Sequence, residues 1–106
     1  MLPSVNKINV EKLKDPFFIY KPKNLKKSVN YFTKNFSGEV LYAVKANPSE
    51  FILKKIYELG IRSFDAASIN EIKLVKSLFD NSKIYFMNPV KPRHAINEAY
   101  YKYGVR

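Results

Sequence analysis

The sequence predicts an α/β fold made of consecutive strand–helix units. Short apolar segments suited to strands alternate with segments in which apolar residues recur every three or four positions, as on one face of a helix. The last three predicted strands start about 22 residues apart. This spacing leaves room for one helix between successive strands, which favours a parallel sheet that is either doubly wound or part of a barrel.

Composition limits the size and class of the protein. The chain has 106 residues and no Cys, and 46% of it is hydrophobic, too large an apolar share for a disordered segment. A closed eight-unit barrel needs roughly 250 residues, so the few units present here cannot close one. No apolar run reaches the ~20 residues that span a bilayer, and the chain starts without the apolar core of a signal peptide. We therefore expect a cytoplasmic protein with no membrane partner.

The net charge of +10, from 19 Lys and Arg against 9 Asp and Glu, invites comparison with nucleic-acid-binding proteins. The lysines of the first 36 positions are scattered, however, including those of an N-terminal basic segment at residues 1–14. Abundant Lys, Asn and Ile are also what an AT-rich genome produces. The charge alone therefore does not favour a nucleic-acid partner.

The first predicted elements are a strand, a helix and a second strand. The apolar run Phe17–Tyr20 lies between two prolines and is typical of a short strand. A helix that ends at Gly38 is predicted by apolar residues at i, i+4, i+7 and i+11, namely Leu25, Val29, Phe32 and Phe36. The continuous apolar run Val40–Val44 predicts a strand buried on both faces.

The next predicted helix starts with Asn47 as N-cap and Glu50 at the capping-box position, and ends at Gly60. Its apolar face comprises Ile52, Leu53, Ile56 and Leu59. Residues 62–67 predict the following strand.

The pattern then repeats. Ser68 and Glu71 form a capping box before a helix whose apolar face comprises Ile72, Val75, Leu78 and Phe79. Residues 83–87 predict the last strand. Pro92 opens a final helix, capped by Gly104, with an apolar face of Ile96, Ala99, Tyr100 and Tyr103.

Polar side chains stand at the ends of three predicted strands: Lys45, Asp65 and Asn88. The carboxyl ends of parallel strands meet at one edge, where active sites of such folds lie, so we expect the three on one rim. A lysine after an apolar strand, if desolvated, is a nucleophile able to form a Schiff base. The alternative is that Lys45 extends past the sheet edge into water, and that Asp65 caps the turn that follows it.

Other polar residues have structural explanations. Glu71 occupies a capping-box position, and Asn88 starts an Asn-Pro loop pair. His94, the only His, is expected at the surface. No ligand spacing predicts a metal site, and the glycines stand at helix ends rather than in a phosphate-binding loop.

Three motifs occur in order along the chain: Tyr-Ala-Val-Lys-Ala-Asn-Pro at 42–48, Phe-Asp-Ala-Ala-Ser at 64–68 followed by Glu71, and Asn-Pro-Val-Lys at 88–91. With their spacing across residues 15–106, they resemble the fold-type III pyridoxal-phosphate decarboxylases, which include ornithine, lysine and diaminopimelate decarboxylases.

The resemblance implies a role for each matching residue. Lys45 would hold pyridoxal 5'-phosphate covalently as a Schiff base, and Ala43 would face the cofactor. Asp65 would lie near the positively charged Schiff-base nitrogen, with Glu71 at the mouth of the same pocket as a second carboxylate of the site. Asn88 would support the pocket floor.

The resemblance also implies a fold and a reaction. Residues 15–106 would form the N-terminal portion of a (β/α)8 TIM-type barrel of the alanine racemase-like fold, not closed in this chain. The reaction would be decarboxylation of a basic amino acid, ornithine or lysine, to a polyamine precursor, with the motifs favouring ornithine decarboxylase over a diaminopimelate decarboxylase fragment.

The family's cofactor-stacking histidine and glycine-rich phosphate loops belong to later parts of its sequence. We therefore expect this chain to be inactive alone and to need the remaining chain or a homodimer partner. The alternative is a non-catalytic interaction or regulatory module derived from a decarboxylase.

Overall fold

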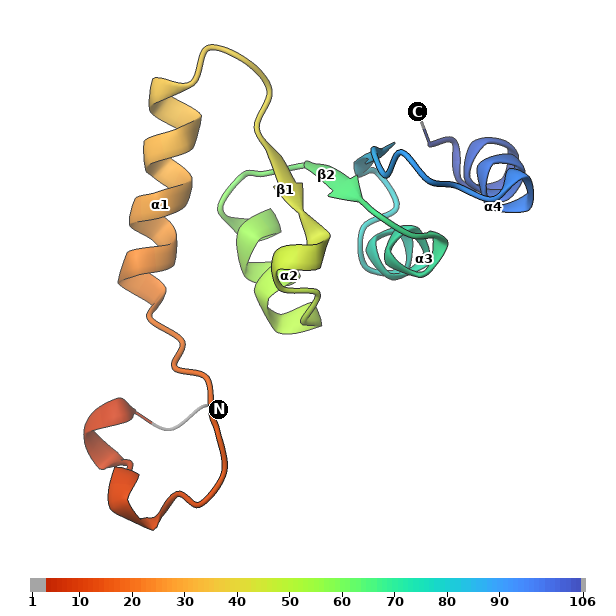
Figure 1. The fold of residues 1–106 in the computed structure, drawn as a ribbon. Coiled ribbons are helices and arrows are strands. Elements are labelled where there is room, and N and C mark those ends of the chain that lie inside the picture. Colours follow the sequence, from red (N-terminus) through yellow and green to blue (C-terminus); the bar gives the residue numbers. More distant parts are fainter. Residues whose placement is uncertain (1–3, 106) are drawn as a thin grey trace.

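The computed structural model describes residues 4–105 (Figure 1). Residues 4–21, called here the arm, are followed by alternating helices and strands. Two short 3₁₀ turns in the arm precede the main elements, which are α1 Pro22–Asn35, β1 Leu41–Ala43, the 3₁₀ turn η3 Val44–Ala46, α2 Glu50–Glu58, β2 Ser63–Ala66, α3 Ile69–Leu78, β3 Lys83–Phe86 and α4 Arg93–Asn97. Helix α4 continues directly into a π-helical turn, Glu98–Lys102. The order of strands and helices matches the sequence prediction from α1 onward.

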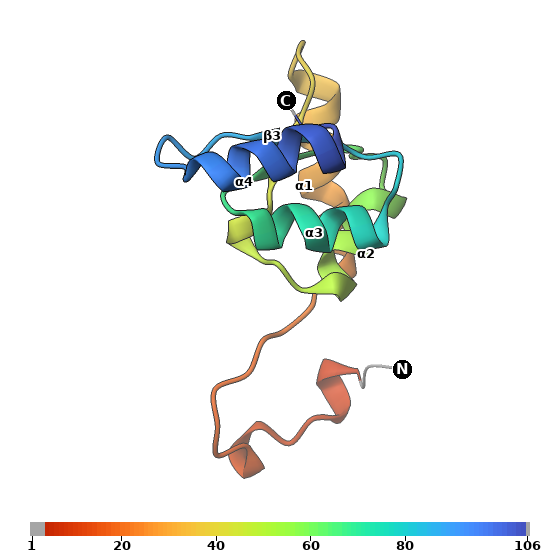
Figure 2. The ribbon, with the colours of Figure 1, turned by 90° about the vertical axis from the view of Figure 1, so that its right-hand side faces the viewer.

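The three strands form one open parallel sheet in the order β1-β2-β3. In register, Ala43 lies beside Asp65, which lies beside Tyr85. The helices between the strands pack on the same face of the sheet, as two perpendicular views show (Figures 1 and 2). A βα barrel also has sequential strands with helices on one face, whereas a doubly wound sheet has helices on both faces.

The main core lies between the sheet and the helices. Alternate residues of a strand point to opposite faces, and the buried ones that face the helices are Phe64, Ala66, Ile84 and Phe86. They pack against buried residues of α2, α3 and α4, namely Leu53, Ile72, Val75 and Ala95. The other face carries Leu41, Ala43, Ser63, Asp65, Lys83 and Tyr85, and is called here the helix-free face.

The predicted strand Phe17–Tyr20 is wrong. Residues 16–21 have no strand structure, and Phe18 is fully exposed. A strand needs a neighbouring strand for its hydrogen bonds, and the arm lies away from the three-stranded sheet (Figure 1). The apolar residues between two prolines therefore form an irregular segment here, because no neighbouring strand pairs with them.

The first predicted buried strand and the helix after it also differ in detail. Strand β1 is half-buried rather than buried on both faces, because it is an edge strand with a helix-free side. Asn47 is not the N-cap of α2: that position belongs to Ser49, and Asn47 Oδ1 accepts the Ser49 N–H at 3.1 Å. Asn47 thus forms a local turn before the helix instead of capping it.

Two predicted apolar helix faces are only partly buried. In α1, Val29 is buried and Leu25 half-buried against Ile56 and Ile61, whereas Phe32 and Phe36 are exposed. Helix α1 meets its neighbours only along this narrow stripe. In the last helix, Ala95 and Ala99 are buried and Tyr103 half-buried, while Ile96 and Tyr100 are exposed. The π-helical turn changes the residues per turn and so shifts the buried face from the 3.6-residue pattern.

Gly60 ends α2 in a conformation that favours glycine. Its φ is +109°, and a Cβ atom added there would meet no atom within 4 Å. Gly60→Ala is therefore expected to destabilise the chain by about 1–2 kcal/mol through backbone conformation alone. Urea unfolding measures the effect.

Gly38→Ala is the matched control. Gly38 lies outside the positive-φ region, and its added Cβ would meet only the exposed ring of Phe36, 2.7 Å from the nearest ring carbon. That ring can turn away, so the control should change stability less. Equal losses in the two variants would contradict the conformational explanation for Gly60.

Candidate functional site

The carboxyl ends of the three strands meet at one edge of the sheet, and three predicted site residues lie there. Lys45 lies in η3 directly after β1, Asp65 is the third residue of β2, and Asn88 is the second residue after β3. The turn η3 contacts β2. Asn88 Nδ2 donates a hydrogen bond to the carbonyl oxygen of Ala67, 3.1 Å away, and so links the ends of β2 and β3. The structure thus brings the three residues to one edge.

The Lys45 side chain is exposed. The sequence left open whether Lys45 is desolvated at the strand end or extends past the sheet edge, and in the described chain its side chain takes the second, exposed position. Strand β1 ends at Ala43, and η3 carries Lys45 beyond the sheet. The result is an accessible primary amine at the edge of the sheet, which is the alternative position foreseen for it.

Tyr42 and Asn47 hold the loop around Lys45, and sequence reasoning missed both roles. The Tyr42 hydroxyl donates to the carbonyl oxygen of Asn47 at 3.3 Å, so one hydrogen bond closes the loop on either side of the lysine. Partial burial raises the pKa of Tyr42, which therefore stays a neutral donor at pH 7. A tyrosine within an apolar strand was the available signal, because its hydroxyl needs a partner when buried.

Asp65 stands on the helix-free face between Ala43 and Tyr85. Its neighbours Phe64 and Ala66 are fully buried on the opposite face, whereas Asp65 is only partly buried. Ala43, also partly buried, leaves space beside the carboxylate because its side chain is a single methyl group. Ala43, Asp65 and Tyr85, called here the row, thus place a small side chain, a carboxylate and a phenol ring side by side on the helix-free face.

Glu71 is engaged at the start of α3. Its Oε2 accepts the N–H of Ala67 at 2.7 Å, while its own N–H donates to Ser68 Oγ at 3.2 Å. The capping box predicted from the sequence is present, shifted by one residue because the carboxylate reaches Ala67 rather than Ser68. Glu71 and Asn88 thus bind the N–H and C=O of the same residue, Ala67, and together fix the turn after β2.

The Ser68 cap leads to a matched pair of variants. Ser68→Ala removes the side-chain hydrogen bond at the N-cap of α3 and should cost about 1 kcal/mol of unfolding free energy. Ser49→Ala, at the N-cap of α2, removes a hydroxyl that makes no capping bond and should cost less. Urea unfolding of both variants decides, and a loss at Ser49 as large as that at Ser68 would contradict the assignment of the caps.

The residues at this edge fit the aldehyde end of the cofactor that the motifs imply. Lys45 offers an accessible amine, Ala43 a small neighbour and Asp65 a carboxylate on the same edge. The glycines with positive φ, Gly60 and Gly104, lie at helix carboxyl ends and not beside Lys45. Within residues 4–105, we find no glycine-rich loop at this edge to hold a phosphate.

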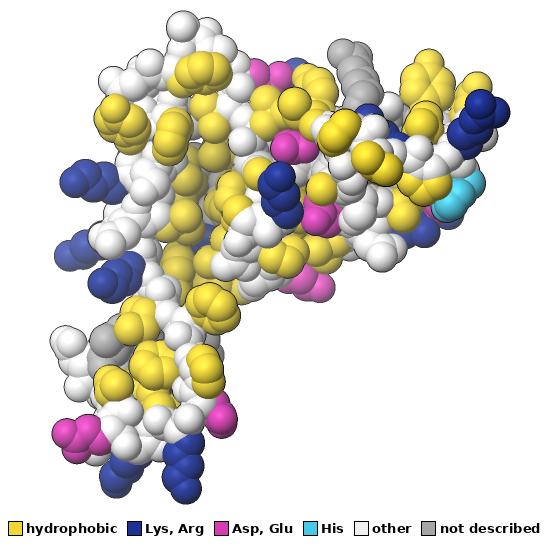
Figure 3. Space-filling view, viewed as in Figure 1, with side chains coloured by type: hydrophobic (Ala, Val, Ile, Leu, Met, Phe, Trp, Pro, Cys, Tyr) yellow, Lys and Arg dark blue, Asp and Glu magenta, His cyan; other side chains and the backbone are white. Residues whose placement is uncertain are grey.

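The remaining surface of the described chain offers less chemistry. His94 is exposed in α4 (cyan in Figure 3). Among residues 4–105, no three His, Cys, Asp or Glu side chains gather as metal ligands. In the same part of the chain, no helix combines the length and apolar character needed to cross a membrane. Lysine side chains project from the outer side of α1 (Figure 3).

Comparison with known proteins agrees with these motifs. A family model described as pyridoxal-dependent decarboxylase, pyridoxal binding domain, matches residues 22–105. The chain is 39% identical over 61 residues to a lysine/ornithine decarboxylase of Selenomonas ruminantium, a match that covers 57% of the chain and 15% of that protein. It is 38% identical over 92 residues to an ornithine decarboxylase of Candida albicans, covering 79% of the chain and 19% of that protein.

The chain therefore spans less than a fifth of the length of these curated relatives. No solved structure matches it significantly. The family match covers most of the chain and includes Lys45, Asp65, Glu71 and Asn88. The chain belongs to the family of pyridoxal-dependent decarboxylases, within their pyridoxal-binding domain, and the cofactor of that domain is pyridoxal phosphate.

Proposed function

We propose that this chain supplies the cofactor-lysine part of a decarboxylase that acts on ornithine or lysine. The observation that carries the proposal is the accessible Lys45 amine at the carboxyl edge of a parallel sheet, next to the strand that presents Asp65. The names of the two relatives support the substrate class, since both act on ornithine and one also on lysine. Diaminopimelate is the competing substrate, because the family motifs are shared.

Each residue has a distinct part in the proposal. The Lys45 amine would hold the cofactor by condensing with its aldehyde group, with release of water, and the Tyr42–Asn47 hydrogen bond orients the loop that carries Lys45. Asp65 balances positive charge close to that amine, and Ala43 leaves room for the cofactor. Glu71, whose carboxylate is bound to the Ala67 N–H, contributes by fixing the turn after β2 at the mouth of the site.

When bound, pyridoxal phosphate supplies an electron sink for the electron pair left behind by departing carbon dioxide. The chain contributes binding and orientation. Its residues supply the amine, a carboxylate that balances charge and a glutamate that fixes the turn after β2. The phosphate group of the cofactor needs hydrogen-bond donors in addition to those at this edge of the sheet. We therefore expect no decarboxylation by the 106-residue chain alone.

The proposal includes a barrel completed by further strands, from the remaining chain or a homodimer partner. Strands β1 and β3 each have a neighbour on one side only, so each offers an unpaired backbone edge. The helix-free face also lacks a covering layer in the described chain, and the one-sided winding is that of a barrel segment.

A chimeric enzyme tests the proposal. The matching segment of the Candida albicans ornithine decarboxylase is replaced by residues 22–105 of this chain, and carbon dioxide release is measured with ornithine, lysine and diaminopimelate. We expect release from ornithine or lysine, and none by the 106-residue chain alone. A folded chimera that releases no carbon dioxide, or acts only on diaminopimelate, would contradict the proposal.

A further inference from the structure

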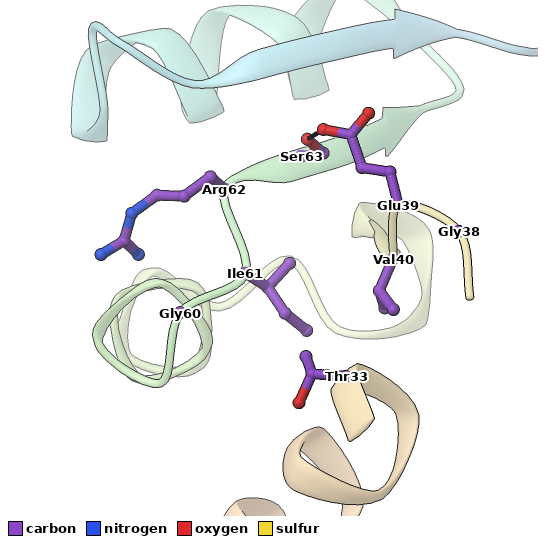
Figure 4. A pocket seen from close by; sticks show the side chains of 8 residues that line it. All are labelled: Thr33, Gly38, Glu39, Val40, Gly60, Ile61, Arg62 and Ser63. Carbon is purple, nitrogen blue, oxygen red and sulfur yellow. Dashed lines mark hydrogen bonds between the residues drawn. The ribbon is translucent and has the colours of Figure 1, made fainter. Parts of the chain in front are cut away.

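The amino end of the helix-free face holds a polar cluster that no motif predicted. Glu39, two residues before β1, accepts hydrogen bonds from three side chains of the neighbouring strands. Ser63 Oγ donates to Glu39 Oε1, which also lies 3.2 Å from Lys83 Nζ. The Tyr85 hydroxyl donates to Glu39 Oε2 at 3.4 Å, the longest of the three contacts. Figure 4 shows the Glu39 carboxylate turned toward Ser63.

The cluster gives the buried Ser63 hydroxyl a hydrogen-bond partner and the Lys83 ammonium group a counter-charge. Ser63 is 1% exposed, so its hydroxyl needs a partner within the protein, and Glu39 is that partner. Lys83 places a positive charge on the same face, and Glu39 is its counter-charge. These contacts lower the pKa of Glu39, chiefly through the Ser63 hydrogen bond and then through Lys83. The carboxylate is therefore the form that the fold favours.

Tyr85 connects this cluster to the candidate site. It stands in the same row as Ala43 and Asp65, and it is the largest side chain of that row. Its hydroxyl is held toward Glu39 at the amino end of the sheet, which is the end opposite to Lys45. The phenol ring is thus drawn away from the carboxyl edge.

We propose that Glu39 is a positioning residue that holds the Tyr85 ring toward the amino end of the sheet and so keeps the space beside Ala43 and Asp65 open for the cofactor. This inference rests on the proposed function, because it assumes that the cofactor lies on that side of the row. Without the Glu39 carboxylate, the untethered ring turns about its side-chain bonds into this space.

The pH dependence of unfolding tests whether the contacts of the Glu39 carboxylate, called here the tether, stabilise the fold. Glu39→Gln should lower the melting temperature at pH 7 by more than the control variant described below, because it removes the charged acceptor of the cluster. A lowered pKa in the folded state gives stability above the unfolded value, near 4.5, that is lost as the pH falls through the folded value. The difference between the wild type and Glu39→Gln should therefore shrink as the pH falls below 4.5.

Lys83 and Tyr85 on β3 contact Glu39, and Arg62 before β2 lines the same pocket. Asp65 lies further along β2, beside Tyr85 in the register of the two strands. Glu50→Gln is the matched control, since Glu50 forms an exposed ion pair with Lys54 at 3.6 Å. A Glu39→Gln effect no larger than that of the control, or one that stays the same as the pH is lowered through the acid range, would contradict a stabilising role for the Glu39 cluster.

Borohydride trapping of pyridoxal phosphate tests the positioning. Borohydride reduces the C=N bond between cofactor and lysine to a stable amine, and peptide mapping measures the yield at Lys45. We expect this yield to fall severalfold in Glu39→Ala and in Tyr85→Phe, because each variant removes one partner of the hydrogen bond that holds the ring. Tyr85→Ala, which has no ring, should keep the yield and should restore it in the Glu39→Ala background.

The outcomes separate the two proposals. Selective labelling of Lys45 in the wild type that Glu39→Ala and Tyr85→Phe leave unchanged overturns the positioning role but keeps the proposed function. Labelling without preference for Lys45 contradicts the proposed function, and the melting comparison then still decides the tether. If a Tyr85 variant fails to fold, Ser63→Ala replaces it as a milder change, expected to reduce the Lys45 yield by weakening the hold on Glu39.

Discussion

Lys45→Ala is expected to reduce carbon dioxide release by the chimeric decarboxylase to the background of an empty-vector extract. The variant removes the amine that would bind the cofactor and leaves the hydrogen bond between Tyr42 and Asn47 in place. Because Lys45 is exposed, its loss should change the melting temperature of the chain little. The loss of activity would therefore come from lost chemistry rather than from unfolding.

Lys45→Arg and Lys27→Ala are the controls. Arginine keeps the positive charge but not the primary amine, so Lys45→Arg should be as inactive as Lys45→Ala. Lys27 is an exposed residue of α1, and its replacement should leave release unchanged. Activity that survives in Lys45→Arg would show that charge rather than the amine is needed.

Phe64→Ala is expected to remove a large part of the stability of the fold. Phe64 is fully buried at the centre of β2, and its ring stacks beside that of Phe79 with centroids 5.7 Å apart. Phe79, at the end of α3, stacks in turn on Tyr57 of α2 with ring centroids 4.1 Å apart. Loss of the Phe64 ring would therefore weaken the packing of both α2 and α3 on the sheet. Truncation of a buried Phe costs about 3–5 kcal/mol, against a total stability of ~5–15 kcal/mol for native proteins.

Phe18→Ala gives the matched control, because the Phe18 side chain is fully exposed in the arm. It should change the unfolding free energy by less than about 0.5 kcal/mol. Urea unfolding followed by circular dichroism measures both variants. A similar loss in the two would place the core elsewhere than between the sheet and α2 and α3.

The strand–helix order was predictable because each local signal agrees with the packing. The apolar residues of α2 and α3 that recur at helical spacing, such as Leu53 and Ile72, are the ones that the sheet buries. The predictions failed where a neighbour decides the structure. Phe17–Tyr20 has strand composition without a strand beside it, and Phe32 has helix spacing without a helix to cover it.

The candidate site was predictable in position but not in contacts. Because parallel strands end at one edge of their sheet, the strand pattern alone predicts that Lys45, Asp65 and Asn88 lie together. Spacing could not decide between a desolvated Lys45 and one that extends into water, nor could it show that Glu39 bonds with residues 24 and 44 positions later in the chain. Such contacts depend on which strands become neighbours, and only the fold determines that.

The most direct test of the central claim is the identity of the lysine that pyridoxal phosphate modifies in the 106-residue chain. The folded protein is incubated with the cofactor, reduced with borohydride and digested, and the modified peptides are quantified against a urea-unfolded sample. We predict modification concentrated at Lys45 in the folded chain and spread over the lysines in the unfolded one. The same even distribution in both samples would contradict a cofactor role for Lys45.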